Sequence, residues 1–116
     1  MYIVYGIKNC NTVKKSLTYL DEHKIAYRFH DYKKEGITKA KLKDWSSQLG
    51  WEKLVNKKGS TWRMLDDATK NKVTSETKAI ELMMEKTSVI KRPLIENGTK
   101  VIALGFEEEV YHSIDW

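Results

Sequence analysis

The first 24 residues, MYIVYGIKNCNTVKKSLTYLDEHK (Met1–Lys24), join a strand pattern to a helix pattern and hold the only cysteine. Residues 2–5, YIVY, are rich in β-forming residues and lead into Gly6, which predicts a first strand. Cys10 follows four residues later, between two asparagines. The single thiol therefore stands where the strand gives way to the next element.

Helical periodicity begins directly after Cys10. Three apolar residues recur at helical spacing and predict a helix through about residue 23: Val13, Leu17 and Leu20. Either Asn11 or Thr12 is expected to cap the start of this helix with its side-chain oxygen.

Length and composition indicate one globular domain over residues 1–116. Hydrophobic residues make up 41% and charged residues 32%, which is a folded rather than a disordered composition. No apolar stretch is long enough to span a membrane, and the N-terminus lacks the features of a signal peptide. A lone cysteine forms no internal disulfide, so nothing indicates an oxidising compartment and we expect a cytoplasmic protein. We also expect a monomer that does not bind membranes.

The net charge of +5 is spread along the chain rather than concentrated. Basic pairs occur at three separate places, and three consecutive glutamates oppose them near the end: Lys14-Lys15, Lys33-Lys34, Lys57-Lys58 and Glu107-Glu108-Glu109. Such dispersion favours a solvated surface over a nucleic-acid interface, so no direct nucleic-acid binding is expected. An anionic small substrate or an acidic protein partner remains compatible with the positive net charge.

The middle of the chain is predicted to be mostly helical. A second strand is expected at 26–32, before a helix capped by Thr38 and ended by Gly50. Its apolar stripe consists of Leu42, Trp45 and Leu49. A further helix is expected over about residues 75–85, with four residues facing inward: Ala79, Ile80, Met83 and Met84.

The last third changes to a strand pattern. VIKRPLIE and KVIALGF flank Asn97-Gly98, a pair that favours the tight turn of an antiparallel hairpin. A short helix is expected at about 107–112. The predicted order is β-α-β, a helical block, then β-β-α.

Two interpretations of Cys10 follow from its surroundings. A lone cysteine is often a small buried hydrophobe. Here, however, its neighbours are polar, and a helix start brings unpaired N–H groups and the positive end of the helix dipole to the sulfur. Lys14 and Lys15 add positive potential. This arrangement favours a reactive thiolate.

Four motifs in this order resemble the ArsC/Spx family, the arsenate-reductase-like branch of the thioredoxin fold, and its small YffB-like members in particular. They are NCNTVKK, NKKGSTWRML, IKRPLI and LGF, and together they cover essentially the whole chain. The resemblance implies an α/β fold with a thioredoxin-like βαβ–ββα core and a helical insertion at about residues 36–86.

The resemblance also assigns the site. Cys10 matches the family nucleophile, and Arg92-Pro93 matches the Arg-Pro before the hairpin, where Pro93 is expected to be cis beside the thiol. Arg92 would stabilise the thiolate and bind an anion, although a surface salt bridge is an alternative role. The remaining residues expected to contact substrate are Asn11, Thr12, Lys57 and Lys58.

Two departures from the family pattern limit the activity. Val13 stands where relatives carry serine or a second cysteine, so any disulfide of Cys10 must be intermolecular. Arsenate reductases also use an arginine after the final strand pair, and ALGFEEEV (103–110) has none. We therefore expect little or no arsenate reduction. His23, His30 and His112 fit no zinc pattern, and no metal is expected.

The leading interpretation is a thiol-dependent oxidoreductase in which Cys10 attacks a small thiol disulfide or a thiolated substrate. It needs no bound cofactor, and a low-molecular-weight thiol such as glutathione would regenerate it. The alternative is an Spx-like regulator that binds the RNA polymerase α subunit, with Gly50 at the contact, although a helix end also explains that glycine. A third possibility is a binding module without activity. The sequence leaves the physiological substrate open.

Overall fold

The computed structural model describes all residues, 1–116, and they form two compact units. The first combines residues 1–35 with residues 92–116. The second is the stretch between them, residues 36–91. Cys10 and Arg92 thus belong to the same unit although 82 positions separate them in the sequence.

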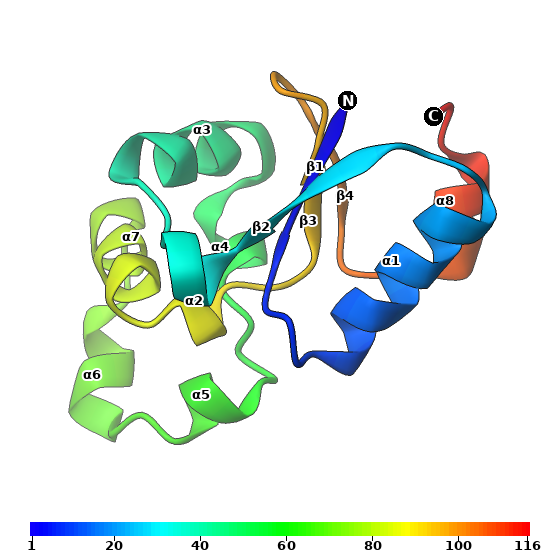
Figure 1. The fold of residues 1–116 in the computed structure, drawn as a ribbon. Coiled ribbons are helices and arrows are strands. Elements are labelled where there is room, and N and C mark those ends of the chain that lie inside the picture. Colours follow the sequence, from blue (N-terminus) through cyan, green and yellow to red (C-terminus); the bar gives the residue numbers. More distant parts are fainter. The chain divides into compact units, whose positions relative to one another are not determined.

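The first unit is built on a mixed sheet of four strands in the order β2-β1-β3-β4 (Figure 1). The strands are β1 (Tyr2–Gly6), β2 (Tyr27–Asp31), β3 (Leu94–Glu96) and β4 (Val101–Leu104). β1 pairs parallel with β2 and antiparallel with β3, and β3 pairs antiparallel with β4. The end of β1, which leads to Cys10, therefore lies beside the start of β3, which follows Arg92 and Pro93.

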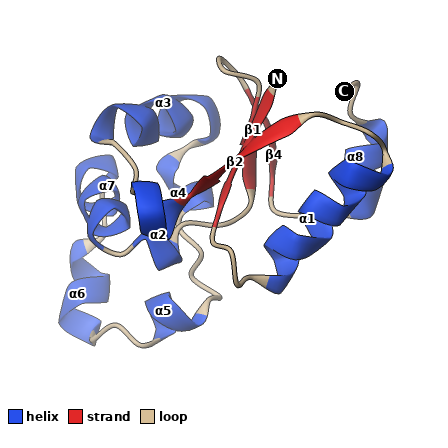
Figure 2. Cartoon of the chain, viewed as in Figure 1, coloured by secondary structure: helices blue, strands red, loops and turns tan.

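Two helices of this unit cover one face of the sheet, α1 (Asn11–Glu22) and α8 (Glu108–Ser113), which Figure 2 shows side by side. Their shared core joins sheet residues Val4, Ile95 and Ala103 to helix residues Tyr19, Leu20 and Tyr111. The Tyr111 hydroxyl is 2.8 Å from Ser16 Oγ of α1 and donates to the carbonyl of Gly105 at 2.9 Å. These bonds tie α1, α8 and the end of β4 together. A third, short helix, α2 (Tyr32–Glu35), follows β2.

The second unit is helical. Its elements are α3 (Lys39–Leu49), α4 (Trp51–Leu54), α5 (Ser60–Arg63), α6 (Asp67–Lys72), α7 (Glu76–Glu85) and the 3₁₀ turn η1 (Thr87–Val89). Thr38 caps α3 by accepting a hydrogen bond from the Lys41 amide, as expected, and Gly50 ends it with φ of 89°. Buried Leu42 and Trp45 of α3 and buried Ile80 and Met83 of α7 form the apolar faces of the unit.

The structure corrects one prediction for α7. Met84 is 44% exposed, whereas the preceding Leu82 is buried with Ala79, Ile80 and Met83. Leu82 therefore takes the place of Met84 on the buried face of α7. No helix of the chain combines the length and the apolar character needed to cross a membrane.

Candidate functional site

Cys10 lies at the junction between β1 and α1. It is the N-cap residue of α1, with extended backbone angles, and its carbonyl accepts the first helical hydrogen bond from the Lys14 amide at 3.0 Å. The side chain is partly exposed. The cysteine therefore lies at the N-terminal end of α1 and is partly exposed, as the sequence predicted for a reactive group.

The prediction that Asn11 or Thr12 caps α1 is wrong. The helix begins at Asn11, so both residues belong to its first turn, and both side chains are exposed. The start is displaced because Val13 must pack under the end of β1, where a Cβ added to Gly6 would lie 2.8 Å from Val13 Cγ2. Burying Val13 at this place leaves Cys10 at the capping position.

Several opposing effects determine the pKa of the Cys10 thiol, and together they lower it. Partial burial alone would raise the pKa, because it disfavours the charged thiolate. The Val13 amide, the positive charge and hydrogen bonding of Arg92, and the Thr12 amide outweigh it. The Val13 and Thr12 amides act as hydrogen-bond donors to the sulfur, and such donors favour the charged thiolate.

Arg92 and Pro93 begin the return of the chain into the first unit. The Arg92-Pro93 peptide bond is cis, as the resemblance implied. Arg92 is half-buried, and its guanidinium acts on the Cys10 sulfur through charge and hydrogen bonding. The carbonyl of buried Pro93 accepts a hydrogen bond from the Gly105 amide at 2.7 Å, which ties this turn to the end of β4. The structure thus brings Cys10 and Arg92 together.

Lys57 and Lys58 belong to the second unit, in the turn between α4 and α5. Both side chains are exposed, and Lys57 Nζ lies 5.3 Å from the centroid of the Trp62 ring. The Lys58 amide donates to Asn56 Oδ1. These contacts are local to the turn, and the role of the two lysines toward the thiol stays a prediction.

The three histidines make contacts that suit structural roles. His23 stacks on Tyr19 at 3.9 Å between ring centroids, and His112 Nδ1 lies 3.0 Å from the Tyr19 hydroxyl. His30 packs against Tyr5. No group of three or more His, Cys, Asp and Glu side chains is arranged to hold a metal ion.

Sequence reasoning missed a hollow beside α1. Five of its lining residues recur along one side of the helix, at positions 11, 14, 15, 18 and 22. Phe106, in the segment before α8, and Glu108, the first residue of α8, line it from the other side. The helical spacing of polar residues was visible in the sequence. Their meeting with Phe106 and Glu108 was not, because it depends on how α1 and α8 pack.

A mixed β-α-β and β-β-α sheet with a cysteine at the start of the first helix and a cis-proline before the hairpin defines a thioredoxin-like α/β protein. The ArsC family model matches residues 5–114, and the chain belongs to this family. An uncharacterised protein of Haemophilus influenzae is 42% identical over 113 residues, 97% of each chain.

Solved structures agree with this assignment. A protein named YffB is 46% identical, with a TM-score of 0.91 and 98% of both chains covered. An arsenate reductase (ArsC) related protein from Brucella melitensis is 39% identical, with a TM-score of 0.77, covering 97% of this chain and 92% of that one. The fold predicted from the resemblance is therefore confirmed.

Proposed function

We propose that this protein is a thiol-dependent oxidoreductase whose nucleophile is Cys10. The observation that carries the proposal is the position of this partly exposed thiol at a helix N-terminus, under the influence of the Arg92 guanidinium. Both features favour thiolate, which is the form that attacks disulfides. Membership of a family with arsenate-reductase-related members supports the same class of chemistry.

The reaction is a thiol–disulfide exchange. The Cys10 thiolate attacks one sulfur of a substrate disulfide, the S–S bond breaks, and the other sulfur leaves as a thiolate with the bonding electrons. A new disulfide then joins Cys10 to the substrate. Because the chain has no second cysteine, an external thiol such as glutathione attacks this disulfide and releases Cys10 as thiolate.

The surrounding residues have complementary roles in this proposal. Arg92 stabilises the thiolate and binds an anionic group of the substrate through its planar guanidinium. Asn11 and Thr12, next to Cys10 in the sequence, offer exposed polar side chains to the substrate, and the buried Pro93 would form the base of the substrate site. The exposed Lys57 and Lys58 would add positive charge for an anionic substrate. We place this chemistry in the cytoplasm, where a lone thiol stays reduced.

Incubation with glutathione disulfide tests the proposal. We expect one glutathione per chain, mapped by peptide mass spectrometry to Cys10, and its removal by excess glutathione. Cys10→Ser is the control that takes up none. An unmodified wild-type chain, under conditions in which glutathione disulfide modifies a free cysteine peptide, would contradict the proposal.

The alternative, an Spx-like regulator that binds the RNA polymerase α subunit, rests on the resemblance alone. Gly50 ends α3 with φ of 89°, a conformation that residues with a Cβ rarely adopt. The helix end therefore requires this glycine whether or not a partner binds there.

A further inference from the structure

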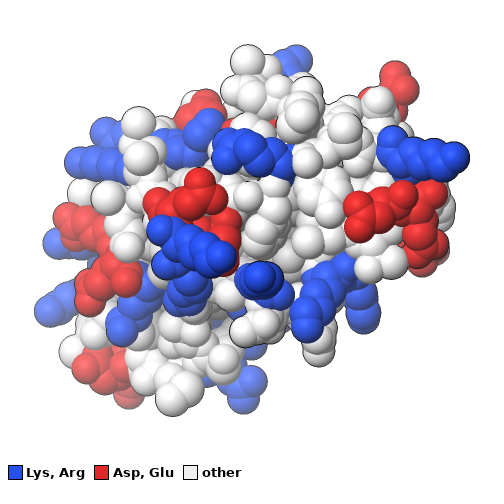
Figure 3. Space-filling model, viewed as in Figure 1, with Lys and Arg blue, Asp and Glu red and all other residues white.

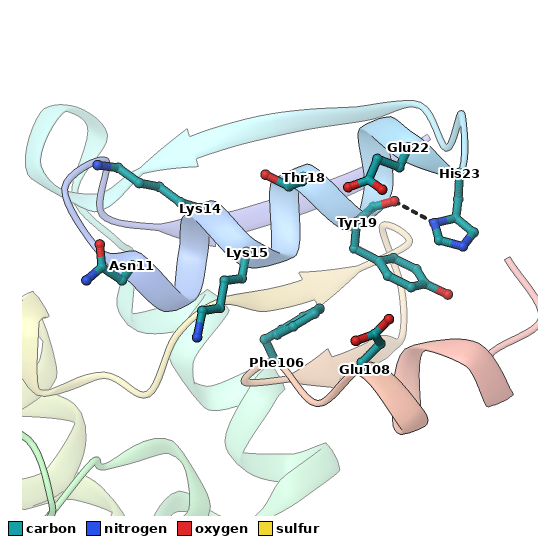
Figure 4. Close-up of a pocket in the computed structure, with 9 residues that line it drawn as sticks. All are labelled: Asn11, Lys14, Lys15, Thr18, Tyr19, Glu22, His23, Phe106 and Glu108. Carbon is teal, nitrogen blue, oxygen red and sulfur yellow. Dashed lines mark hydrogen bonds between the residues drawn. The ribbon is translucent and has the colours of Figure 1, made fainter.

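A hollow of about 670 Å³ lies between α1 and the segment from β4 to α8, within the first unit. Figure 4 shows its lining side chains: Asn11, Lys14, Lys15, Thr18, Tyr19, Glu22, His23, Phe106 and Glu108. Its volume is in the range of ligand sites in proteins. One end begins at Asn11, the residue after Cys10, and the other end is at His23.

Charge divides this hollow into two ends. Lys14 and Lys15 lie at the end near Cys10, where the N-terminus of α1 adds positive potential (Figure 4). Glu22 and Glu108 lie toward the other end. Glu108 is 3.5 Å from His112 Nε2, but both side chains are more than half exposed, so this pair leaves the carboxylate open to solvent.

The floor between the two ends is apolar. Figure 4 shows the Phe106 ring beneath α1 and the Tyr19 ring beside it, and their centroids are 6.3 Å apart. Aromatic rings provide contact area for the backbone and apolar side chains of a ligand. The hollow therefore offers a cationic end, an aromatic floor and an acidic end in that order from Cys10.

The length of the hollow indicates the size of its ligand. Twelve helical residues, from Asn11 to Glu22, span about 18 Å at 1.5 Å per residue. An extended peptide of about five residues covers this length at roughly 3.3 Å per residue. A tripeptide thiol spans about 10 Å and would leave the acidic end unused.

We propose that this hollow docks the segment of a protein substrate that flanks its disulfide-bonded cysteine. This segment has acidic residues next to the cysteine and basic residues three to five positions after the cysteine. The inference rests on the proposed function of Cys10 and names its substrate class, a protein mixed disulfide. The Cys10 thiolate attacks the sulfur of the protein cysteine, the small thiol leaves as thiolate, and the new disulfide joins Cys10 to the docked protein. The external thiol then attacks the Cys10 sulfur, which releases the protein thiolate and leaves the small thiol on Cys10. A second equivalent frees Cys10 and yields the oxidised disulfide of the small thiol.

The test compares two six-residue peptides, each joined through an N-terminal cysteine to glutathione. One continues with two glutamates, an alanine and two lysines, and the other exchanges the glutamates and lysines. Release of glutathione upon formation of the Cys10–peptide disulfide gives the rate. Reversal of two exposed charge pairs should make the second peptide roughly three- to tenfold slower, and high salt should reduce the difference.

Protein variants provide the matched controls. The double variant Lys15→Glu, Glu22→Lys should abolish or invert the preference between the peptides. Lys34→Glu changes an exposed lysine outside the hollow and should leave the preference as in the wild type. Iodoacetamide alkylation of Cys10 in each variant corrects the rates for changes in thiol reactivity.

Three results separate the possible failures. Equal rates for the two peptides, or an unchanged preference in the double variant, would overturn the docking groove while leaving Cys10 as a nucleophile. Glutathione disulfide reacting as fast as the preferred peptide, with the same dependence on residues 15 and 22, would assign the hollow to the small thiol instead. Lack of any reaction of Cys10, even with a neutral small disulfide, would remove the proposed function itself.

Discussion

At the scale of single residues, the reactivity of Cys10 is a balance between burial and local positive potential. Burial raises its pKa, whereas the Val13 and Thr12 amides and Arg92 lower it. The sequence allowed the helix-end contribution to be predicted, because a strand pattern stops and a helical pattern starts around Cys10. The contribution of Arg92 required the family resemblance, since no periodicity relates positions 10 and 92.

Replacing Arg92 tests its part in this balance. Arg92→Ala should raise the Cys10 pKa, because the nearby guanidinium favours the thiolate. Arg92→Lys should restore much of the pKa but less anion binding, since the charge remains and the planar geometry is lost. The measurement is the pH profile of alkylation. Identical profiles and anion affinities for wild type and Arg92→Ala would make Arg92 a structural residue.

At the scale of elements, the junction between β1 and α1 depends on close packing of Gly6 against Val13. Val13 is fully buried, and a Cβ on Gly6 would come within 2.8 Å of its Cγ2. Val13 is β-branched and stiff, so it yields little. This contact is one reason why the helix starts where it places Cys10 at its end.

Gly6→Ala should therefore destabilise the protein by about 1–3 kcal/mol through overpacking. The double variant Gly6→Ala, Val13→Ala should lose less unfolding free energy than the two single variants lose together, by about 1 kcal/mol. The reason is that the smaller side chain at position 13 makes room for the added methyl group. Chemical denaturation of the four proteins of the cycle measures this coupling. Strict additivity would show that the two residues do not oppose each other.

The capping position of Cys10 also predicts a dependence of stability on pH. Folding lowers the Cys10 pKa, so the thiolate stabilises the fold fully above the pKa of the unfolded thiol, about 8.5, and this contribution is lost as pH falls through the folded pKa. The difference in unfolding free energy between wild type and Cys10→Ala should therefore increase from pH 6 to pH 9.

Cys10→Ser serves as the reference for this experiment. The serine hydroxyl can cap α1 at every pH. The unfolding free energy of Cys10→Ser should therefore exceed that of Cys10→Ala by about 1 kcal/mol, with little dependence on pH. A wild-type advantage over Cys10→Ala that is constant or shrinks with rising pH would contradict a thiolate cap.

Local patterns predicted most elements, and tertiary packing explains the misses. The second strand was expected at 26–32 and spans Tyr27–Asp31, and the hairpin around Asn97-Gly98 is present. The polar segment that forms α6 carries no apolar stripe, and none of its residues is buried, so periodicity could not identify it. The exposure of Met84 likewise follows from which face of α7 is covered.

At the scale of the whole molecule, the chain leaves the first unit after Glu35 and re-enters it at Arg92. The charge pattern of the surface is mixed, and Figure 3 shows basic and acidic residues interspersed on the face drawn. The hollow beside α1 could not be predicted from the sequence, because its walls come from segments about 90 positions apart.

The arginines of the chain lead to a prediction about specificity. The only three are Arg28, Arg63 and Arg92, and none follows the final strand β4. A tetrahedral oxyanion is bound best by several planar guanidinium groups, so arsenate should be held weakly. With glutathione as reductant, arsenate-dependent turnover should not exceed that of Cys10→Ser. Robust turnover that requires Cys10 would contradict this.

The pKa of Cys10 distinguishes an activated thiol from an ordinary one. It is obtained from the rate of iodoacetamide alkylation as a function of pH, with Cys10→Ser as the blank. An activated thiolate predicts a midpoint clearly below that of an unstructured cysteine peptide, about 8.5. The same measurement in unfolding denaturant should return the midpoint to the peptide value. A native midpoint at or above the peptide value would show that Cys10 is an ordinary thiol at a helix end.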